Sequence, residues 1–172
     1  NEGAAEWVTM DLFYTDPDGL ILEHWDTIAP HIAQGASGAS MVDGATDVDL
    51  TGDTAASKAL VLEYTKQVLQ EGGHDKAAAF VSDHVIQHAT PIGAGLDGLT
   101  AWLGSQAAGS YEMLFHLMGH GDFVMTYGKR HRDGTDVAVF DLYRVSGGKI
   151  VEHWMNEEGI GPRETWGNSG KF

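Results

Sequence analysis

The sequence predicts an α+β fold in which a cone-shaped, curved antiparallel sheet wraps around helices, and three observations support this. Helix-type spacing of apolar residues begins after Asp53, strand-type alternation dominates after Ser110, and glycine-containing turns separate the strands. A sheet with one apolar face must bury that face, and the preceding helices are the partners available. A cone of this kind leaves a pocket at its open end, where ligands commonly bind.

The helical part is predicted from its caps and its spacing. Asp53 or Thr54 is a plausible N-cap, and apolar residues recur on one face at Leu60, Val61, Tyr64 and Val68. Gly72-Gly73 ends this helix. Asp75 caps a short second helix over 76–81, residues 84–88 are strand-like, and a third short helix is expected over 99–103.

The β part consists of four strand-like runs, over 111–118, 123–129, 137–145 and 149–157. In the last two, joined by Gly147-Gly148, alternation places Asp141, Tyr143, Val151, His153 and Met155 on one face. A second version of this hairpin runs from Asp11 to Asp26 around a Pro-Asp-Gly turn. The chain therefore contains an internal repeat.

Composition narrows the function. The net charge is −15 and no basic cluster stands out, which argues against nucleic acid as a partner. There is no cysteine, so carboxylates, histidines, hydroxyls and aromatic groups must carry any chemistry. No apolar run has membrane-spanning length, and we expect a cytoplasmic protein. The first residue is Asn1 rather than Met, so a fragment or processed form is expected and a signal peptide stays open.

Residues 53–172 resemble the SnoaL-like polyketide cyclases and aldol-condensation enzymes. These belong to the nuclear transport factor 2-like superfamily, a cystatin-like roll that also includes ketosteroid isomerase. The resemblance rests on the order and spacing of several short motifs. They are the opening helix with its Gly-Gly end, 85–88 (VIQH), 95–99 (GLDGL), 121–124 (GDFV), 141–145 (DLYRV), 148–154 (GKIVEHW) and the tail 168–172 (NSGKF).

The resemblance implies a site without cofactor or metal that abstracts a proton next to a carbonyl in a small hydrophobic ligand, leading to aldol-type cyclisation or isomerisation. It places His88 where ketosteroid isomerases carry their general base and Asp141 where they carry an oxyanion-stabilising acid. We expect His88 to be the base, assisted by Asp141 and His153. The expected substrate-binding residues are Tyr64, Trp102, His116, Tyr127, Val139, Met155 and Glu157.

Three alternatives stay open. Ala89, Ala94 and Met155 stand where the family usually has polar residues, which favours a catalytically relaxed ligand-binding or assembly module of the same fold. In a second alternative, the histidines and Asp141 are buried polar groups that only form hydrogen bonds with one another. A zinc site would require His88, His116, His153 and Asp141 to converge from different strands.

The repeat predicts three regions. Residues 1–29 are interpreted as the terminal hairpin of an incomplete first copy, 30–52 as a linker and 53–172 as a complete SnoaL-like domain. The first-copy counterparts of the site are Asp11, His24 and Asp26. Because an isolated hairpin is marginally stable, we expect a homodimer or association with the missing N-terminal piece.

Overall fold

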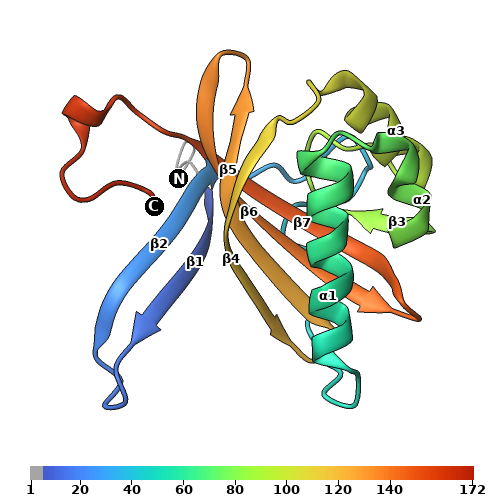
Figure 1. Ribbon diagram of the computed structural model, residues 1–172, viewed down its shortest axis with the longest axis horizontal. Helices are drawn as coiled ribbons and strands as arrows, with labels where there is room; N and C mark the ends of the chain where they lie inside the picture. The colour runs from blue at the N-terminus through green and yellow to red at the C-terminus, as the bar shows by residue number, and fades with distance from the viewer. Residues whose placement is uncertain (1–5) are drawn as a thin grey trace.

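The computed structural model describes residues 6–172 and confirms the α+β fold, with a curved five-stranded sheet beside a small set of helices (Figure 1). The strand order is β3-β7-β6-β5-β4. All neighbours in this sheet are antiparallel except β3 and β7, which are parallel. The strands are β3 (Val81–Gln87), β4 (Tyr111–His120), β5 (Phe123–Arg132), β6 (Thr135–Ser146) and β7 (Lys149–Gly159).

The helices begin and end where local chemistry dictates. Asp53 caps α1 (Thr54–Tyr64) by accepting a hydrogen bond from the backbone N–H of Ala56 at 3.0 Å. The helix continues as the π-helical turn η1 (Thr65–Gln70) and stops before Gly72, whose φ of +72° favours glycine. The others are η2 (His74–Lys76), α2 (Ala77–Phe80), α3 (Gly95–Ser105) and η3 (Arg163–Thr165); α3 is longer than predicted.

The main core lies between α1, α3 and the concave face of the sheet. Its buried members come from the helices and from the five-stranded sheet, among them Val61, Val68, Leu99, Leu103 and Val139. Burying each such side chain contributes about 1.5–3 kcal/mol. This packing fixes the inner face of the sheet against the helices and thereby positions the polar residues on it.

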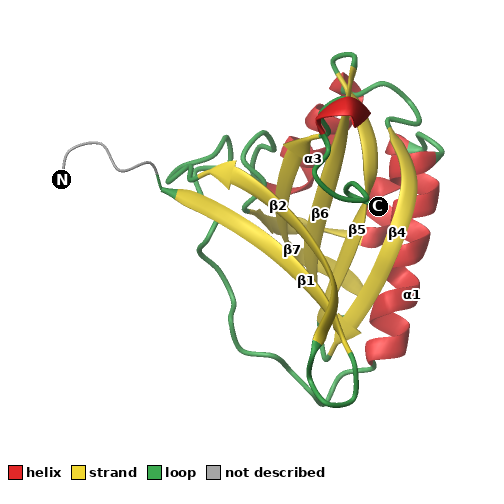
Figure 2. Cartoon of the chain, turned by 90° about the vertical axis from the view of Figure 1, so that its left-hand side faces the viewer, coloured by secondary structure: helices red, strands yellow, loops and turns green. Residues whose placement is uncertain are grey.

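The N-terminal hairpin forms a layer of its own. Strands β1 (Trp7–Thr15) and β2 (Ile21–Pro30) make a separate two-stranded sheet. It crosses the outer face of the five-stranded sheet, with α1 on the far side (Figure 2). Leu12 packs there against Tyr127, Ala138 and Phe140 in a second apolar cluster. Residues 1–5 of the predicted first-copy segment lie outside the described residues.

The segment after β2 follows the outer face of β7 before it reaches α1. Trp154 donates a hydrogen bond from Nε1 to the Asp43 carbonyl at 2.7 Å. Gly44 has a φ of +116°, and a Cβ there would collide with Glu152, Trp154 and His88. Only glycine fits this position without rearrangement. The C-terminal tail also returns to this face, where Tyr127 donates from its hydroxyl to the Lys171 carbonyl at 2.6 Å.

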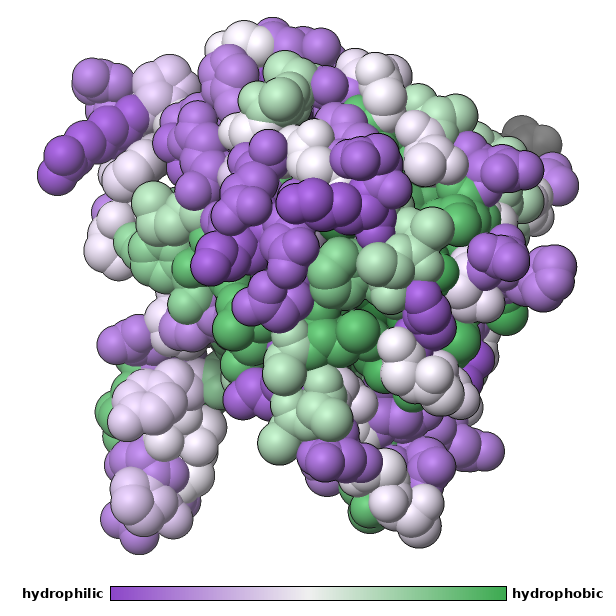
Figure 3. Space-filling view, turned by 45° about the vertical axis from the view of Figure 1, so that its right-hand side comes forward, coloured by the Kyte–Doolittle hydropathy of each residue, from purple (hydrophilic) through white to green (hydrophobic). Residues whose placement is uncertain are grey.

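The β1–β2 hairpin contacts the rest of the molecule along only part of its length. In the space-filling view the tip of the β1–β2 hairpin stands apart from the body of the molecule (Figure 3). Among the described residues, no helix is both long enough and apolar enough to cross a membrane.

Candidate functional site

Asp141 and His153 form a buried pair on the inner face of the sheet. Strands β6 and β7 pair with Tyr143 opposite His153 and Asp141 opposite Met155, so all four residues face the helices. Asp141 Oδ1 lies 2.9 Å from His153 Nε2. Asp141 is 1% exposed and His153 is 5% exposed, so both side chains are almost completely removed from water. The structure therefore brings Asp141 and His153 together, as the sequence predicted.

Gln87 extends this pair into a chain of three polar side chains. It lies opposite His153 in the parallel β3–β7 ladder, and its Oε1 is 2.9 Å from His153 Nδ1. An oxygen atom therefore lies 2.9 Å from each ring nitrogen of His153, which fixes the orientation of the ring between Gln87 and Asp141. Gln87 Nε2 is buried and has no hydrogen-bond partner among the described residues, so it is a spare donor.

Three buried tyrosines surround the pair: Tyr64 from α1, Tyr111 from β4 and Tyr143 from β6. Tyr143 stacks on the His153 ring at 4.7 Å, and Tyr64 meets Tyr143 edge-on at 5.9 Å. Burial, and then the negative charge of Asp141, raise the pKa of all three hydroxyls well above the ordinary value. The tyrosines therefore remain protonated and are available as hydrogen-bond donors.

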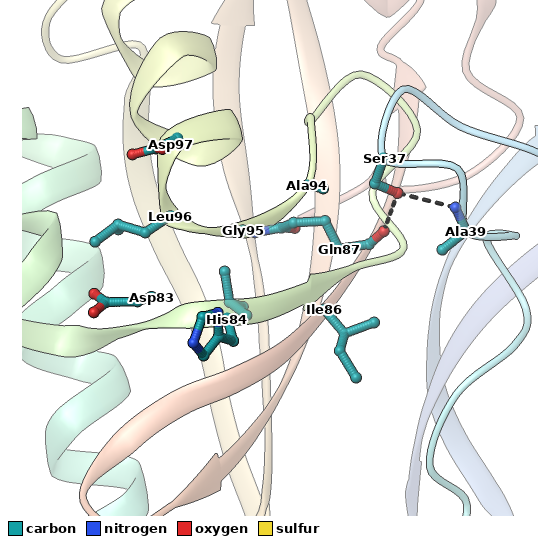
Figure 4. Close-up of a pocket in the computed structure, with 11 residues that line it drawn as sticks. Ser37, Ala39, Asp83, His84, Ile86, Gln87, Ala94, Gly95, Leu96 and Asp97 are labelled. Atoms are coloured by element: carbon teal, nitrogen blue, oxygen red, sulfur yellow. Dashed lines mark hydrogen bonds between the residues drawn. The ribbon is translucent and has the colours of Figure 1, made fainter.

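A groove of about 740 Å³ runs along the free edge of β3. Its walls are β3 and the start of α3, including Asp83, Val85, Ala94 and Leu96, and it reaches Gln87 (Figure 4). In this view Ser37 closes one end of the groove, where its hydroxyl donates to the Gln87 carbonyl at 2.5 Å. Gln87 thus belongs both to the groove and to the Asp141–His153 chain.

His88 does not join this site. The sequence suggested an inward side chain, but the residue leaves β3 toward the outer face, where Nε2 lies 2.9 Å from Glu152 Oε1. Its ring stacks on Trp154 at 4.7 Å, and Nδ1 is 2.8 Å from the Ser40 carbonyl. Its neighbour Gln87 faces inward instead, because a shift of one residue moves a side chain to the opposite face of a strand.

The predicted binding residues divide between the two faces. Tyr64 and Val139 belong to the core, with Trp102 packed against it, and Met155 and Glu157 lie on the same face of β7 as His153. His116 and Tyr127 pair with each other across β4 and β5 on the outer face. There His116 contacts Trp25, and Tyr127 stacks on Phe140. These two residues are therefore separated from Asp141 and His153 by the sheet.

Arg130 on β5 is an interior residue that the sequence did not single out. It is 1% exposed, and its guanidinium lies 5.4 Å from the Trp102 ring and 5.5 Å from the Tyr111 ring. Nε is 2.9 Å from Glu157 Oε2, but the geometry is not that of a hydrogen bond, and Nη1 has no partner among the described residues. Its alternation with Thr126 and Gly128 along β5 is the signal that could have identified it as inward.

The four groups considered for zinc do not converge, because His88 and His116 lie on the outer face and Asp141 and His153 on the inner face. Among the described residues, two exposed groups bring ligand atoms within 4.8 Å of one another. They are Asp11–His24–Asp26 and Glu112–His131–Asp136. The first group contains the first-copy counterparts, which lie together on the hairpin.

Comparisons with known proteins identify the fold. A scan against family models and a search of curated proteins find no match. Among solved structures, a ketosteroid isomerase-like protein from Kribbella flavida matches with a TM-score of 0.56, at 12% identity over 69% of this chain and 93% of its own. A nuclear transport factor 2-like protein of unknown function from Burkholderia xenovorans matches with a TM-score of 0.54, at 17% identity over 67% and 92%.

A protein of unknown function with a cystatin-like fold, from Xanthomonas campestris, matches with a TM-score of 0.51. Its identity is 22% over 59% of this chain and 89% of its own. At such identities the likeness concerns the fold. The curved sheet, the helices on its concave face and these matches together show that the chain has the nuclear transport factor 2-like fold.

Proposed function

We propose that the cone interior catalyses proton abstraction next to a carbonyl in a small hydrophobic compound, with Asp141 as the base. The observation that carries the proposal is the buried chain Gln87–His153–Asp141 among three protonated tyrosines. His153 engages Asp141 Oδ1, which leaves Oδ2 to accept the substrate proton. The base is therefore Asp141 rather than His88, which lies behind the sheet.

The proposed step balances within the site. The substrate C–H bond breaks, its proton moves to Asp141 Oδ2, and the electron pair becomes an enolate whose oxygen accepts hydrogen bonds from tyrosine hydroxyls. Asp141 then returns the proton to a different carbon in an isomerisation. In an aldol-type closure, the enolate carbon attacks a second carbonyl and Asp141 protonates the resulting alkoxide.

Substrate enters, in this proposal, from the groove along β3. The groove ends at Gln87, whose free Nε2 offers a hydrogen bond to a carbonyl oxygen. Because Asp141 is only 1% exposed, side chains at the groove floor must move before a substrate reaches it. Leu96, partly buried at the start of α3, is an apolar side chain of that wall and packs against the core.

The proposal is tested by deuterium exchange at carbons next to the carbonyl of small cyclic ketones, such as 2-tetralone, followed by proton NMR. His153→Gln should lower the exchange rate about 10- to 100-fold, because it removes the group that orients Asp141. His131→Gln, which alters an exposed His–Asp pair of similar geometry (3.0 Å to Asp136), should leave the rate unchanged. Equal rates in all three proteins would overturn the proposal.

A second candidate is a ligand-binding module without catalysis. It is favoured by Met155, which is 5% exposed. The Met155 sulfur accepts a hydrogen bond from the Tyr111 hydroxyl at 3.8 Å. A polar group at that position would be available to chemistry, whereas a thioether only fills space. Saturable binding of the ketones without any deuterium exchange would support this candidate over the first.

A further inference from the structure

The hairpin β1–β2 reproduces the site-bearing hairpin β6–β7 in atomic detail. In β1–β2 the paired residues are Asp11 with Asp26 and Phe13 with His24. In β6–β7 they are Asp141 with Met155 and Tyr143 with His153. The register is therefore the same in both hairpins.

The side-chain geometry is repeated as well. His24 Nε2 lies 2.9 Å from Asp11 Oδ1, the distance found between His153 and Asp141. The His24 ring stacks on Phe13 at 4.3 Å with an interplanar angle of 3°. The corresponding stack of His153 on Tyr143 has 4.7 Å and 9°. We infer that β1–β2 is one half of a second acid–base site, completed by helices and strands like those of residues 54–132.

The two hairpins differ in what covers them. Asp141, Tyr143 and His153 are buried beneath the helices, whereas Phe13 is 49% exposed and the His24 side chain is 41% exposed. Trp7 and Ile28 on the same hairpin face are 59% and 41% exposed. The opposite face, with Leu12, is already packed on the five-stranded sheet. The uncovered face is therefore the one that corresponds to the inside of a cone, and it points toward the viewer in Figure 2.

The covered hairpin indicates the chemistry of the missing cover. Over β6–β7, α1 supplies Tyr64 against Tyr143, β3 supplies Gln87 to His153 Nδ1, and β5 extends the sheet beside β6. By the same geometry, β2 requires a parallel strand with a polar acceptor for His24, and β1 requires an antiparallel strand. A second copy of the described chain does not supply these elements, because its own residues 54–132 already cover β6–β7.

The second site would favour a more polar substrate than the first. Asp26 occupies the position of Met155, so a second carboxylate oxygen lies within 4.8 Å of the Asp11 and His24 ligand atoms. Asp26 Oδ1 accepts a hydrogen bond from Lys171 Nζ at 3.0 Å. A hydroxylated or otherwise hydrogen-bonding carbonyl compound would offer a donor to the other carboxylate oxygen once the hairpin is covered. This choice of substrate class rests on the proposed function, whereas the coverage of the hairpin does not.

Coverage is tested by modification of His24 with diethyl pyrocarbonate, quantified by peptide mass spectrometry. The 172-residue chain is compared with the translation product of the same reading frame extended upstream. We expect His24 to react at least tenfold more slowly in the longer product, while the exposed His131, also paired with an aspartate, reacts equally in both. Equal reactivity of His24 in both products, or an upstream frame too short for such a block, would overturn the inference.

The chemistry is tested separately by the variant Asp11→Asn. In the longer product it should lower exchange of deuterium into hydroxylated cyclic ketones at least tenfold, and in the 172-residue chain it should change nothing. If His24 is protected but Asp11→Asn has no effect in the longer product, the hairpin is covered but does not form an acid–base site, and that part of the inference is overturned. The first experiment therefore tests the coverage of the hairpin, and the second tests its chemistry.

Discussion

Glu152 is a buried carboxylate that organises the outer face of β7. It is 1% exposed and accepts hydrogen bonds from Arg144 Nε at 2.8 Å and from the backbone N–H of Ala45 at 3.2 Å, with His88 Nε2 at 2.9 Å. Burial alone would raise the pKa of Glu152, but the hydrogen bonds from His88, Arg144 and Ala45 outweigh it and hold the pKa below its ordinary value. The ionised form is therefore stabilised by folding.

Replacing Glu152 by glutamine should destabilise the protein by about 2–3 kcal/mol at pH 7, somewhat less than a fully buried pair, because Arg144 is partly exposed. A lowered folded-state pKa gives stability that is present above the unfolded-state value, about 4.3, and is lost as pH falls. Urea unfolding at pH 7 and pH 3.5 should show the difference from wild type shrinking at the lower pH. A difference that is constant with pH, or equal to that of the exposed Glu164→Gln control, would contradict this account.

The interior tyrosines give a second prediction at the same scale. Because folding raises the pKa of Tyr64, Tyr111 and Tyr143, stability should fall as pH rises above about 10, where the unfolded chain releases these protons. Absorbance at 295 nm and far-ultraviolet circular dichroism, followed together against pH, should show their ionisation coinciding with unfolding. Ionisation of all five tyrosines of the chain with an intact dichroism spectrum would refute the burial of these three around Asp141.

At the scale of elements, the sequence predicts the order of helices and strands well and the facing of several strands poorly. Val85 and Ile86 are both apolar, so alternation alone does not decide which faces inward; in the structure Val85 is 2% exposed and Ile86 is 47% exposed. Because facing alternates along a strand, the sequence also leaves open which of Gln87 and His88 faces inward. In β6, by contrast, Asp141 lies between the apolar Phe140 and Leu142, and the strand pairing places Asp141 and His153 on one face, as alternation predicts.

The hairpin β1–β2 is attached to β7 by a few polar contacts. Asn156 donates from Nδ2 to the carbonyls of Val8 at 2.9 Å and Thr27 at 3.3 Å. Glu158 accepts from the backbone N–H of Ile28 at 3.0 Å and from Lys171 Nζ at 2.8 Å. The strand that carries His153 on its inner face therefore holds the hairpin on its outer face.

Asn156→Ala should loosen this attachment, because it removes the donor of one buried and one partly buried carbonyl at a cost of about 1–3 kcal/mol. Hydrogen exchange followed by NMR should show amides of β1 and β2 exchanging at least fivefold faster, with β5 and β6 unchanged. Asn168→Ala, in the exposed tail, is the matched control. Uniform acceleration across the whole molecule would instead mean that hairpin and sheet unfold as one unit.

At the scale of the molecule, three layers explain why the sequence misplaced some residues. In an antiparallel sheet with one face in solvent, apolar and polar residues alternate clearly along each strand. Here the hairpin, the segment after β2 and the tail cover the outer face. Tyr127 and Phe140 on that face are both 0% exposed, as buried as the inner Val139. With apolar residues required on both faces, pattern alone does not separate the pocket side from the packing side.

The same layering gives the molecule its proposed division of roles. The inner face of β6–β7 holds the Asp141–His153 pair beneath the helices, and the outer face binds a hairpin with a pair of the same geometry. Packing the two hairpins back to back directs their Asp–His pairs away from each other. One chain thus presents one enclosed pair and one open pair.

The most direct test of the central claim is the rate of deuterium exchange into 2-tetralone by Asp141→Asn, compared with Asp136→Asn, which alters an exposed aspartate beside His131. Both substitutions remove one carboxylate that lies next to a histidine, but only Asp141 lies inside the cone. The account predicts a loss of at least a thousandfold for Asp141→Asn and no change for Asp136→Asn, with circular dichroism confirming that both proteins are folded. A folded Asp141→Asn protein that exchanges at the wild-type rate would contradict it.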